Sequence, residues 1–236
     1  MHGKKIKESI PLEGIKSSIA AHMSKSLSES AQITLMGELN MTEMVNFRER
    51  IITLQADGED RISYLDILVF IVSKALKACP TMNCSLIDNE IRIWDEINIG
   101  VAVALGEDGL LVPVVKEADQ RSIIEISKEL KRLVKGVQHG NLPPEDVMGG
   151  TFTVTTLGRN GVTSFQTPIL NQPEAAILAT GAIVKKPVVI EDEIVAAPMM
   201  AYSLTFDHRL INGYGAELFI KQIQNFIEVP EKLLVY

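Results

Sequence analysis

The chain has 236 residues, of which 46% are hydrophobic and 22% are charged, and its formal net charge is −7. Such a chain can bury a sizeable core and still form one domain. The acidic balance, without a block of basic residues, argues against nucleic acid or an anionic membrane as a direct partner. No apolar run approaches the roughly 20 residues of a membrane helix.

Two cysteines, Cys79 and Cys84, and a start without an apolar signal segment favour a reducing compartment. We therefore expect a cytoplasmic protein, or a protein of the mitochondrial matrix if the source is eukaryotic. The histidines, at positions 2, 22, 139 and 208, show no metal-ligand spacing, and Cys-x-x-Cys is absent. No metal site is expected from this pattern.

Five segments carry apolar residues at helical spacing. In the first, an apolar residue recurs at every fourth position from Ile15 to Leu27. Ser63 and Ser122 are placed to cap two other helices, because a serine hydroxyl accepts from the free N–H groups of the first turn. The predicted helices are residues 15–27, 42–56, 63–79, 122–140 and Gly213–Ile227, the last with a core stripe of Leu218, Phe219, Ile223, Phe226 and Ile227.

Alternating or continuous apolar runs predict strands, and the run Leu110–Lys116 predicts burial on both faces. Helices and strands mix without strict β-α-β alternation, so we expect an α+β fold with a mixed β-sheet and flanking helices. The predicted strands are residues 31–39, a hairpin that turns at Asp88-Asn89, Ile97–Leu105, Leu110–Lys116, Thr151–Thr156, Ala175–Val184, Val188–Val195 and Pro198–Asp207, with a polar loop at Gly158–Asn171.

His208 ends the last predicted strand. The strand period of two places it in one row with Leu204 and Phe206, while Thr205 and Asp207 face the other side. Burial at the end of this row would disfavour the imidazolium and keep a neutral ring available as a general base. The alternative is a core histidine that is hydrogen-bonded to a backbone carbonyl.

Asn212 stands four residues after His208, directly before the last helix. An asparagine there is a good N-cap, and Asn-Gly is common in turns. The functional interpretation is that its amide fixes the loop that carries His208. Taken alone, the capping interpretation is the stronger of the two.

Thr151, Thr153 and Thr155 alternate with apolar residues, so one face of their strand carries a row of hydroxyls. Such rows are common in strands whose threonines are solvated or paired across strands. The functional interpretation requires one hydroxyl, at the end of the strand, to donate to an oxyanion. The segment Gly158–Gly161 allows close backbone approach to a ligand, but it lacks the spacing of a phosphate-binding loop. Because no nucleophile stands beside His208, the sequence favours direct transfer over a covalent acyl-enzyme.

Asp207–Gly213 is similar to the D-H-R-x-x-D/N-G signature of the dihydrolipoamide acyltransferases, whose catalytic domains form the cores of 2-oxoacid dehydrogenase complexes. Further matches run in order along nearly the whole chain. We interpret residues 1–9 as a linker or an expression remnant and residues 10–236 as the catalytic domain. The matching stretches are Ile10–Met23, Asn98–Val103, Gly109–Val114, Gly149–Val154 and Asn171–Leu178.

The resemblance implies a chloramphenicol-acetyltransferase-like fold that is assembled as trimers, with an active site at each subunit boundary. His208 is then the base on one subunit, and Thr155, at the family's usual serine position, is the oxyanion donor of the neighbour. Asn212 holds a position that is aspartate in many members and asparagine in some. Coenzyme A and a dihydrolipoyl arm are the implied substrates, and no residue is assigned to coenzyme A binding.

The resemblance also implies partners. These are lipoyl domains, together with decarboxylase and dihydrolipoamide dehydrogenase components that bind through domains absent from this chain. The lipoyl group would belong to such a separate domain. The apolar tail Leu233–Tyr236 resembles tails that the family places between trimers of cubic or icosahedral shells. The acyl group and the number of trimers do not follow from the sequence.

Two positions depart from the family's usual residues. Lys25 stands where many members have an arginine thought to steady the catalytic loop, and lysine lacks the bidentate fork of arginine. Gln32 replaces a common histidine. The residues at Lys25 and Asn212 leave open the alternative of a scaffold core with weak activity. A second alternative is a stand-alone acetyltransferase of the chloramphenicol type with a small hydroxyl acceptor, against which stand the opening helix and the long tail.

Overall fold

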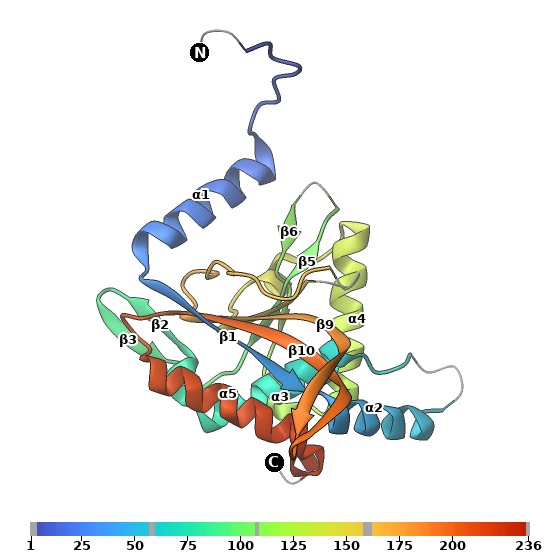
Figure 1. The fold of residues 1–236 in the computed structure, drawn as a ribbon. Coiled ribbons are helices and arrows are strands. Elements are labelled where there is room, and N and C mark those ends of the chain that lie inside the picture. Colours follow the sequence, from blue (N-terminus) through green and yellow to red (C-terminus); the bar gives the residue numbers. More distant parts are fainter. Residues whose placement is uncertain (1–3, 57–59, 107–108, 158–161, 235–236) are drawn as a thin grey trace.

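A computed structural model describes residues 4–56, 60–106, 109–157 and 162–234. Its centre is a six-stranded sheet in the order β1-β10-β9-β8-β4-β7 (Figure 1). The pairs β4–β8 and β8–β9 are parallel and the others are antiparallel, so the predicted mixed sheet is confirmed. The strands are β1 (Gln32–Asn40), β4 (Ile99–Val101), β7 (Val114–Val115), β8 (Phe152–Thr156), β9 (Ala176–Ile190) and β10 (Glu193–Asp207).

Helices α2, α3 and α5 lie on one side of the sheet, and α1 lies on the other side (Figure 1). Two small hairpins complete the described fold, β2–β3 and β5–β6. The bounds are α1 (Gly14–Glu29), α2 (Thr42–Leu54), α3 (Tyr64–Ala78), α4 (Ile123–His139), α5 (Gly213–Glu228), β2 (Cys84–Ile87), β3 (Glu90–Ile93), β5 (Val103–Ala104), β6 (Leu110–Leu111) and the 3₁₀ turns Pro80–Met82, Ala118–Gln120, Pro144–Val147 and Pro230–Leu234. Among the described residues, no helix has the length and apolar content needed to cross a bilayer.

Two helices begin with the serine caps that the sequence predicts. The hydroxyl of Ser63 accepts from the backbone N–H of Asp66, and the Asp66 carboxylate accepts from the N–H of Ser63. Ser122 and Glu125 form the same reciprocal pair at α4. Each pair satisfies two N–H groups, which is the capping-box arrangement.

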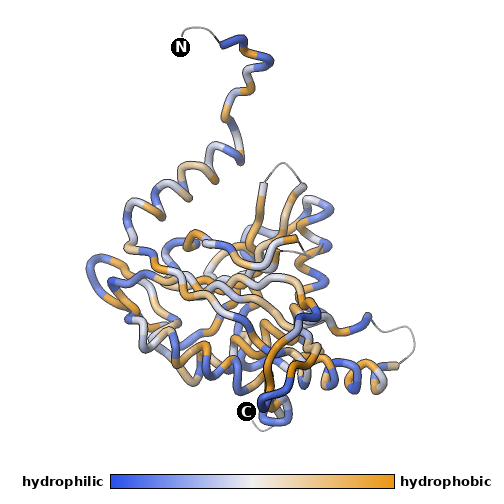
Figure 2. The backbone as a smooth tube through the Cα atoms, viewed as in Figure 1, coloured by the Kyte–Doolittle hydropathy of each residue, from blue (hydrophilic) through white to orange (hydrophobic). Residues whose placement is uncertain are grey.

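The core lies between the sheet and helices α3 and α5, where the tube is rich in hydrophobic residues (Figure 2). Phe152 of β8 packs on Phe219 of α5 with ring centroids 5.5 Å apart. One predicted core residue is wrong, because Leu218 is 42% exposed, whereas Ala216 and Ile220 are buried.

Two strand boundaries differ from the prediction. The three strands expected between Ala175 and Asp207 are two strands of 15 residues, β9 and β10, that meet at a turn where Glu191 and Asp192 have positive φ. Pro187 and Pro198 stand beside the expected strand ends, yet neither interrupts β9 or β10. Pro187 lies beyond the part of β9 that pairs with β8, and Pro198 lies just beyond the part of β10 that pairs with β1, where its carbonyl accepts from the N–H of Met41. The outer edge of such a two-stranded arm needs no N–H donor, so proline is tolerated there.

The strands expected at Ile97–Leu105 and Leu110–Lys116 are each split in two. The N–H of Val101 donates to Pro113, but the next N–H, of Ala102, donates to Val154 of β8. These two bonds alternate between the two neighbours of β4, as they do in any strand that lies inside a sheet. Beyond Ala102, β5 and β6 pair with each other, apart from the main sheet. Burial on both faces holds for β7, whereas Leu110 is 44% exposed.

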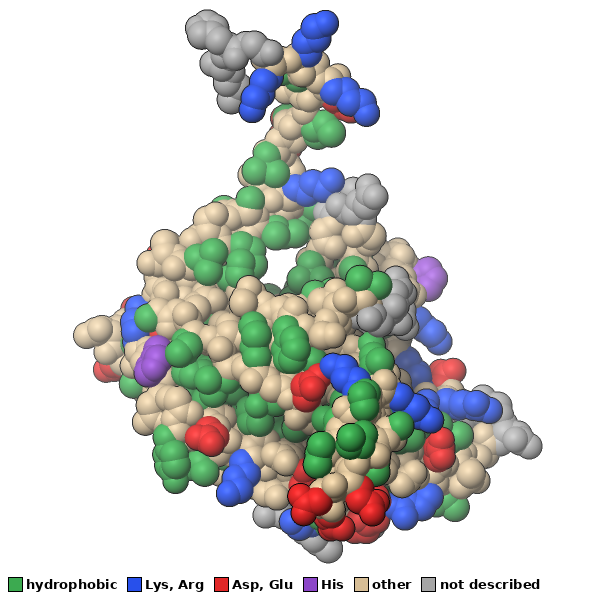
Figure 3. Space-filling view, in the orientation of Figure 1, with side chains coloured by type: hydrophobic (Ala, Val, Ile, Leu, Met, Phe, Trp, Pro, Cys, Tyr) green, Lys and Arg blue, Asp and Glu red, His purple; other side chains and the backbone are tan. Residues whose placement is uncertain are grey.

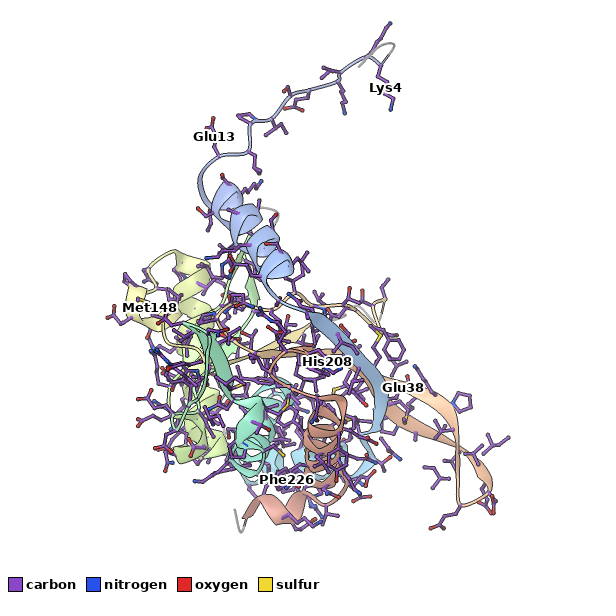
Figure 4. The ribbon with its side chains drawn as sticks, turned by 90° about the vertical axis from the view of Figure 1, so that its left-hand side faces the viewer. Lys4, Glu13, Glu38, Met148, His208 and Phe226 are labelled. Atoms are coloured by element: carbon purple, nitrogen blue, oxygen red, sulfur yellow. The ribbon has the colours of Figure 1, made fainter. Side chains whose placement is uncertain are left out.

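Helix α1 forms as predicted, but its apolar stripe is not buried by the rest of the chain. Ile15 is 45% exposed and Leu27 is 55% exposed. The segment from Lys4 to Glu13 projects from the body (Figure 4). Hydrophobic side chains are also visible on the face drawn in Figure 3. At the other end of the chain, Leu233 is buried, and residues 235–236 of the predicted tail lie outside the described part.

Candidate active site

The loop after β10 is held by an ion pair within the Asp-His-Arg motif. Nε of Arg209 donates to both carboxylate oxygens of Asp207 at 3.0 Å, and Nη2 donates to Oδ2 at 2.6 Å. Burial opposes the charge of Asp207, but hydrogen bonds from Arg209 and from the N–H of Ala31 outweigh it and lower the pKa of the carboxyl. A buried carboxylate with a bidentate partner fixes the backbone on both sides of His208.

His208 is anchored through its backbone, and its side chain is free to act. Its N–H donates to the carbonyl of Ala31 at 2.9 Å. The imidazole contacts the ring of Phe206 with centroids 5.9 Å apart, and among the described residues no hydrogen bond to its ring nitrogens occurs. The expected burial is wrong for a single chain, because His208 follows the last strand residue and is exposed in a turn. The described residues therefore leave this ring open to solvent.

Asn212 is the N-cap of α5, as predicted. Its Oδ1 accepts from the N–H of Gly215 at 2.8 Å. The loop ahead of it is closed by the backbone of Leu210 and Ile211, whose N–H groups both donate to the carbonyl of Asp207. Asn212 thus fixes the start of α5, and through it the end of the loop that carries His208.

The threonine row has three different environments. The hydroxyl of Thr151 bonds to the backbone of Asn98, and the hydroxyl of Thr153 donates to Oε2 of Glu174 at 2.6 Å. Thr155 is half-buried near the end of β8, and its hydroxyl has no hydrogen-bond partner among the described residues. The segment Gly158–Gly161, expected to approach a ligand, lies outside the described residues.

Thr155 and His208 do not meet within one chain. Thr155 pairs with Ala179 of β9, and Ala179 pairs with Ser203 of β10. His208 lies five residues beyond Ser203, which corresponds to about 17 Å along the strand, and two strand spacings add about 10 Å across the sheet. Two groups so far apart cannot act on one reacting carbon. Two pockets of about 650 and 670 Å³ are lined by none of the three candidate residues.

The two departures from the family pattern have different outcomes. Lys25 approaches Glu29 at 3.9 Å and makes no contact with the His208 loop among the described residues. Gln32 connects the end of α1 to the loop before β9, because its Nε2 donates to Ser26 and Ser30 while its Oε1 accepts from Leu170. Arg209, which belongs to the motif itself, bonds to Asp207 in this loop.

One buried acid was missed by the sequence analysis. Glu174 is 2% exposed, and it accepts from Thr153 and from the side-chain amide of Asn171. Burial raises its pKa to about 8, and the hydrogen bonds from Thr153 and Asn171 only partly oppose this rise. Its signal in the sequence is a single charge that opens the apolar strand Ala175–Leu178. Among the described residues, no group of three His, Cys, Asp or Glu side chains could hold a metal ion.

The fold is that of the chloramphenicol acetyltransferases, as predicted. Chloramphenicol acetyltransferase superposes with a TM-score of 0.54 at 14% identity over 94% of this chain and all of that chain, a level of likeness that shows the fold alone. The family model described as "2-oxoacid dehydrogenases acyltransferase (catalytic domain)" matches residues 4–235. The chain belongs to this family.

Relatives with longer sequences support the same assignment. The acetyltransferase component of the pyruvate dehydrogenase complex of Bacillus subtilis strain 168 is 38% identical over 95% of this chain and 51% of its own length. The chain thus spans about half the length of the curated relatives it matches.

Two solved structures are also similar over nearly their whole lengths. One is a dihydrolipoamide acetyltransferase of Azotobacter vinelandii, studied for the role of a serine, a histidine and an asparagine in its mechanism; it has a TM-score of 0.90 and 28% identity over 96% of this chain and 93% of that chain. The other is the cubic core of the pyruvate dehydrogenase multienzyme complex, with a TM-score of 0.90 and 28% identity over 99% of this chain and 95% of that chain.

Proposed function

We propose that this protein transfers an acyl group between a dihydrolipoyl group and coenzyme A, at a site shared by two copies of the chain. The observation that carries this proposal is the separation of Thr155 and His208 on one sheet. Each residue has a free functional group, and neither has the other within reach. A second copy that places its Thr155 opposite His208 would join the two and would cover the exposed imidazole.

The role assigned to His208 is that of general base. A thiol pKa of about 8.5 suits proton transfer to a neutral imidazole near pH 7. The Asp207–Arg209 pair supports this role because it holds the loop without contacting the ring. In the Azotobacter vinelandii enzyme the histidine and asparagine under study are four positions apart, as His208 and Asn212 are here.

The role assigned to Thr155 is donation to the oxyanion. A preorganised hydroxyl in a water-excluded site stabilises the charge that develops on the carbonyl oxygen, and one such donor typically contributes about 2.7–4 kcal/mol. The unpaired hydroxyl of Thr155 supports this role, since those of Thr151 and Thr153 are already bonded. The extra methyl group of threonine restricts the rotamers of this donor.

The proposed reaction has two proton transfers. His208 takes the proton from the thiol of coenzyme A, and the thiolate sulfur attacks the carbonyl carbon of the acyl-dihydrolipoyl thioester. Thr155 of the neighbouring copy donates to the oxyanion of the tetrahedral intermediate. The bond from carbon to the dihydrolipoyl sulfur then breaks, and the imidazolium returns its proton to that sulfur. The products are acyl-coenzyme A and a dihydrolipoyl dithiol.

Self-association is part of the proposal. The exposed stripe of α1, including Ile15 and Leu27, is an apolar surface that a second copy can cover. We infer trimers that assemble into a larger shell, with lipoyl domains, a decarboxylase and a dihydrolipoamide dehydrogenase as partners in the complete complex. The name of the Bacillus subtilis relative favours acetyl as the acyl group. The domain division at residue 10 and a cytoplasmic location stay predictions.

A panel of acyl-coenzyme A thioesters tests the proposal, with free dihydrolipoamide as acceptor and light scattering for particle mass. We expect transfer with acetyl-coenzyme A fastest and a particle larger than a trimer. A large particle without transfer would support the scaffold alternative. A bare trimer that acylates a small alcohol but not dihydrolipoamide would support the stand-alone acetyltransferase.

A further inference from the structure

Glu174 lies between the two elements that carry the proposed catalytic groups. On one side its Oε2 accepts from Thr153, two residues before Thr155 on the same face of β8. On the other side the next residue, Ala175, accepts from the backbone N–H of Asp207 at 2.9 Å. The carboxyl of Glu174 is therefore hydrogen-bonded to β8, and the residue after Glu174 is hydrogen-bonded to Asp207, which precedes His208.

The position of this carboxyl is closely defined. Its Oε1 accepts from Nδ2 of Asn171 at 3.1 Å, and Oδ1 of Asn171 is 3.1 Å from Nε2 of His22 on α1. A Cβ atom at Gly150 would lie 2.8 Å from Oε1, so the carboxyl packs closely against Gly150 and a side chain there would have to displace it. The chain of contacts His22–Asn171–Glu174–Thr153 thus runs from α1 to β8.

We propose that Glu174 is a positioning residue for acyl transfer, whose carboxyl fixes β8 and Thr155 relative to the segment that leads into Asp207 and His208. This inference rests on the proposed function. A small shift of a reacting group away from its productive geometry lowers the rate without weakening substrate binding. Glu174 itself has no role in contacting substrate.

Burial disfavours the charged form of this carboxyl and outweighs the hydrogen bonds that it accepts from Thr153 and Asn171. Its elevated pKa, about 8, agrees with a site that lacks a compensating cation. No ion pair to Glu174 occurs among the described residues, and a charge there would draw in water or displace the side chain. The titratable residues near it are His22, which contacts Asn171, and Asp95 and Glu96, which line the same pocket. Cys84 and Asp207 are also near, because their backbone groups bond to Ala175.

The test compares Glu174→Gln, Glu174→Ala and Thr153→Val with wild type. Glutamine can keep both hydrogen bonds, since its oxygen accepts from Asn171 and its amide donates to Thr153. We expect Glu174→Ala and Thr153→Val to lower kcat by about 10-fold to 100-fold with an unchanged KM for coenzyme A, and Glu174→Gln to restore kcat near pH 7. Thr151→Val is the matched control, because its buried hydroxyl bonds only to Asn98.

The pH profile separates positioning from simple packing. The ratio of kcat for Glu174→Gln to kcat for wild type should rise as the pH passes about 8, because only wild type ionises there. A ratio that is constant with pH, or a Thr153→Val variant as active as the Thr151→Val control, would overturn the role of Glu174 while leaving acyl transfer intact. A wild-type protein without acyl transfer would instead contradict the proposed function, and the positioning role with it.

Discussion

Asp207 and Arg209, the residues on either side of His208, form a bidentate ion pair. Asp207 is 1% exposed while Arg209 is on the surface, so the carboxylate depends on this one guanidinium and on backbone N–H groups. Both partners come from the motif itself. The loop that carries the proposed base is thus hydrogen-bonded by its own residues.

For Arg209→Met we expect a loss of about 1–2 kcal/mol of unfolding free energy, since a hydrogen-bonded partner of a buried charge is removed and solvent partly screens the pair. Activity should fall about 10-fold or more as the loop loses its fixed geometry. Urea unfolding and steady-state kinetics measure the two effects. Arg132→Met removes a different arginine, which pairs with Glu129 and Asp146, and is the control; equal activity in both variants would contradict the role of Arg209.

For His208→Ala we expect acyl transfer to fall by about 10²-fold to 10⁴-fold, the usual contribution of a general base. Stability should change little, because the imidazole is exposed and its described contact is with Phe206. Transfer is measured with acetyl-coenzyme A and dihydrolipoamide, and thermal unfolding is followed in parallel. His139→Ala, at an exposed histidine of α4, should retain full activity. Near-normal turnover of His208→Ala would remove it from the reaction.

For Thr155→Val we expect kcat to fall about 10²-fold to 10³-fold with little change in the KM for coenzyme A, because the hydroxyl acts on the transition state. Thr155→Ser keeps the hydroxyl and should keep most of the activity. The exposed neighbour Thr156 provides the control variant Thr156→Val. If Thr155→Val and Thr156→Val have equal kcat, another group stabilises the oxyanion.

Mixing the two inactive variants tests whether two copies share one site. If His208→Ala and Thr155→Val chains are refolded together, about one site in four receives both intact residues under random assembly, and activity reappears. If both residues acted within one chain, no mixture would recover activity, since every chain would lack one of them. The measurement is kcat per site against the mixing ratio.

Stability should also depend on Glu174 in a pH window set by its pKa. The pKa of the Glu174 carboxyl is 4.5 in the unfolded chain and about 8 in the folded protein. Between these values the folded state holds the extra proton, so the wild-type free energy of unfolding falls as pH rises. Glutamine does not titrate, so Glu174→Gln should gain stability relative to wild type across this window and stay level above about pH 8. Urea unfolding at several pH values measures the difference, and a flat difference would contradict the raised pKa.

The sequence alone determined most of the elements and the identity of the family. Ser63 and Ser122 mark helix starts because capping depends on neighbours within one turn, and the turn at Asp88-Asn89 is equally local. The motif around His208 is contiguous, so its resemblance could be recognised without coordinates. The expected roles of His208, Thr155 and Asn212 came from that resemblance and remain predictions.

Only the tertiary structure decided which residues that are distant in the sequence become neighbours in the fold. It joined the three strands expected between Ala175 and Asp207 into two that run through Pro187 and Pro198, because the outer edge of a projecting hairpin needs no N–H donor there. It buried Glu174 beside Thr153, a contact across 21 positions that no local pattern records. It also separated Thr155 from His208 by the register of three strands. That register depends on pairing across the whole sheet, which is why the need for a second copy of the chain is visible in the fold and not in the spacing of the residues.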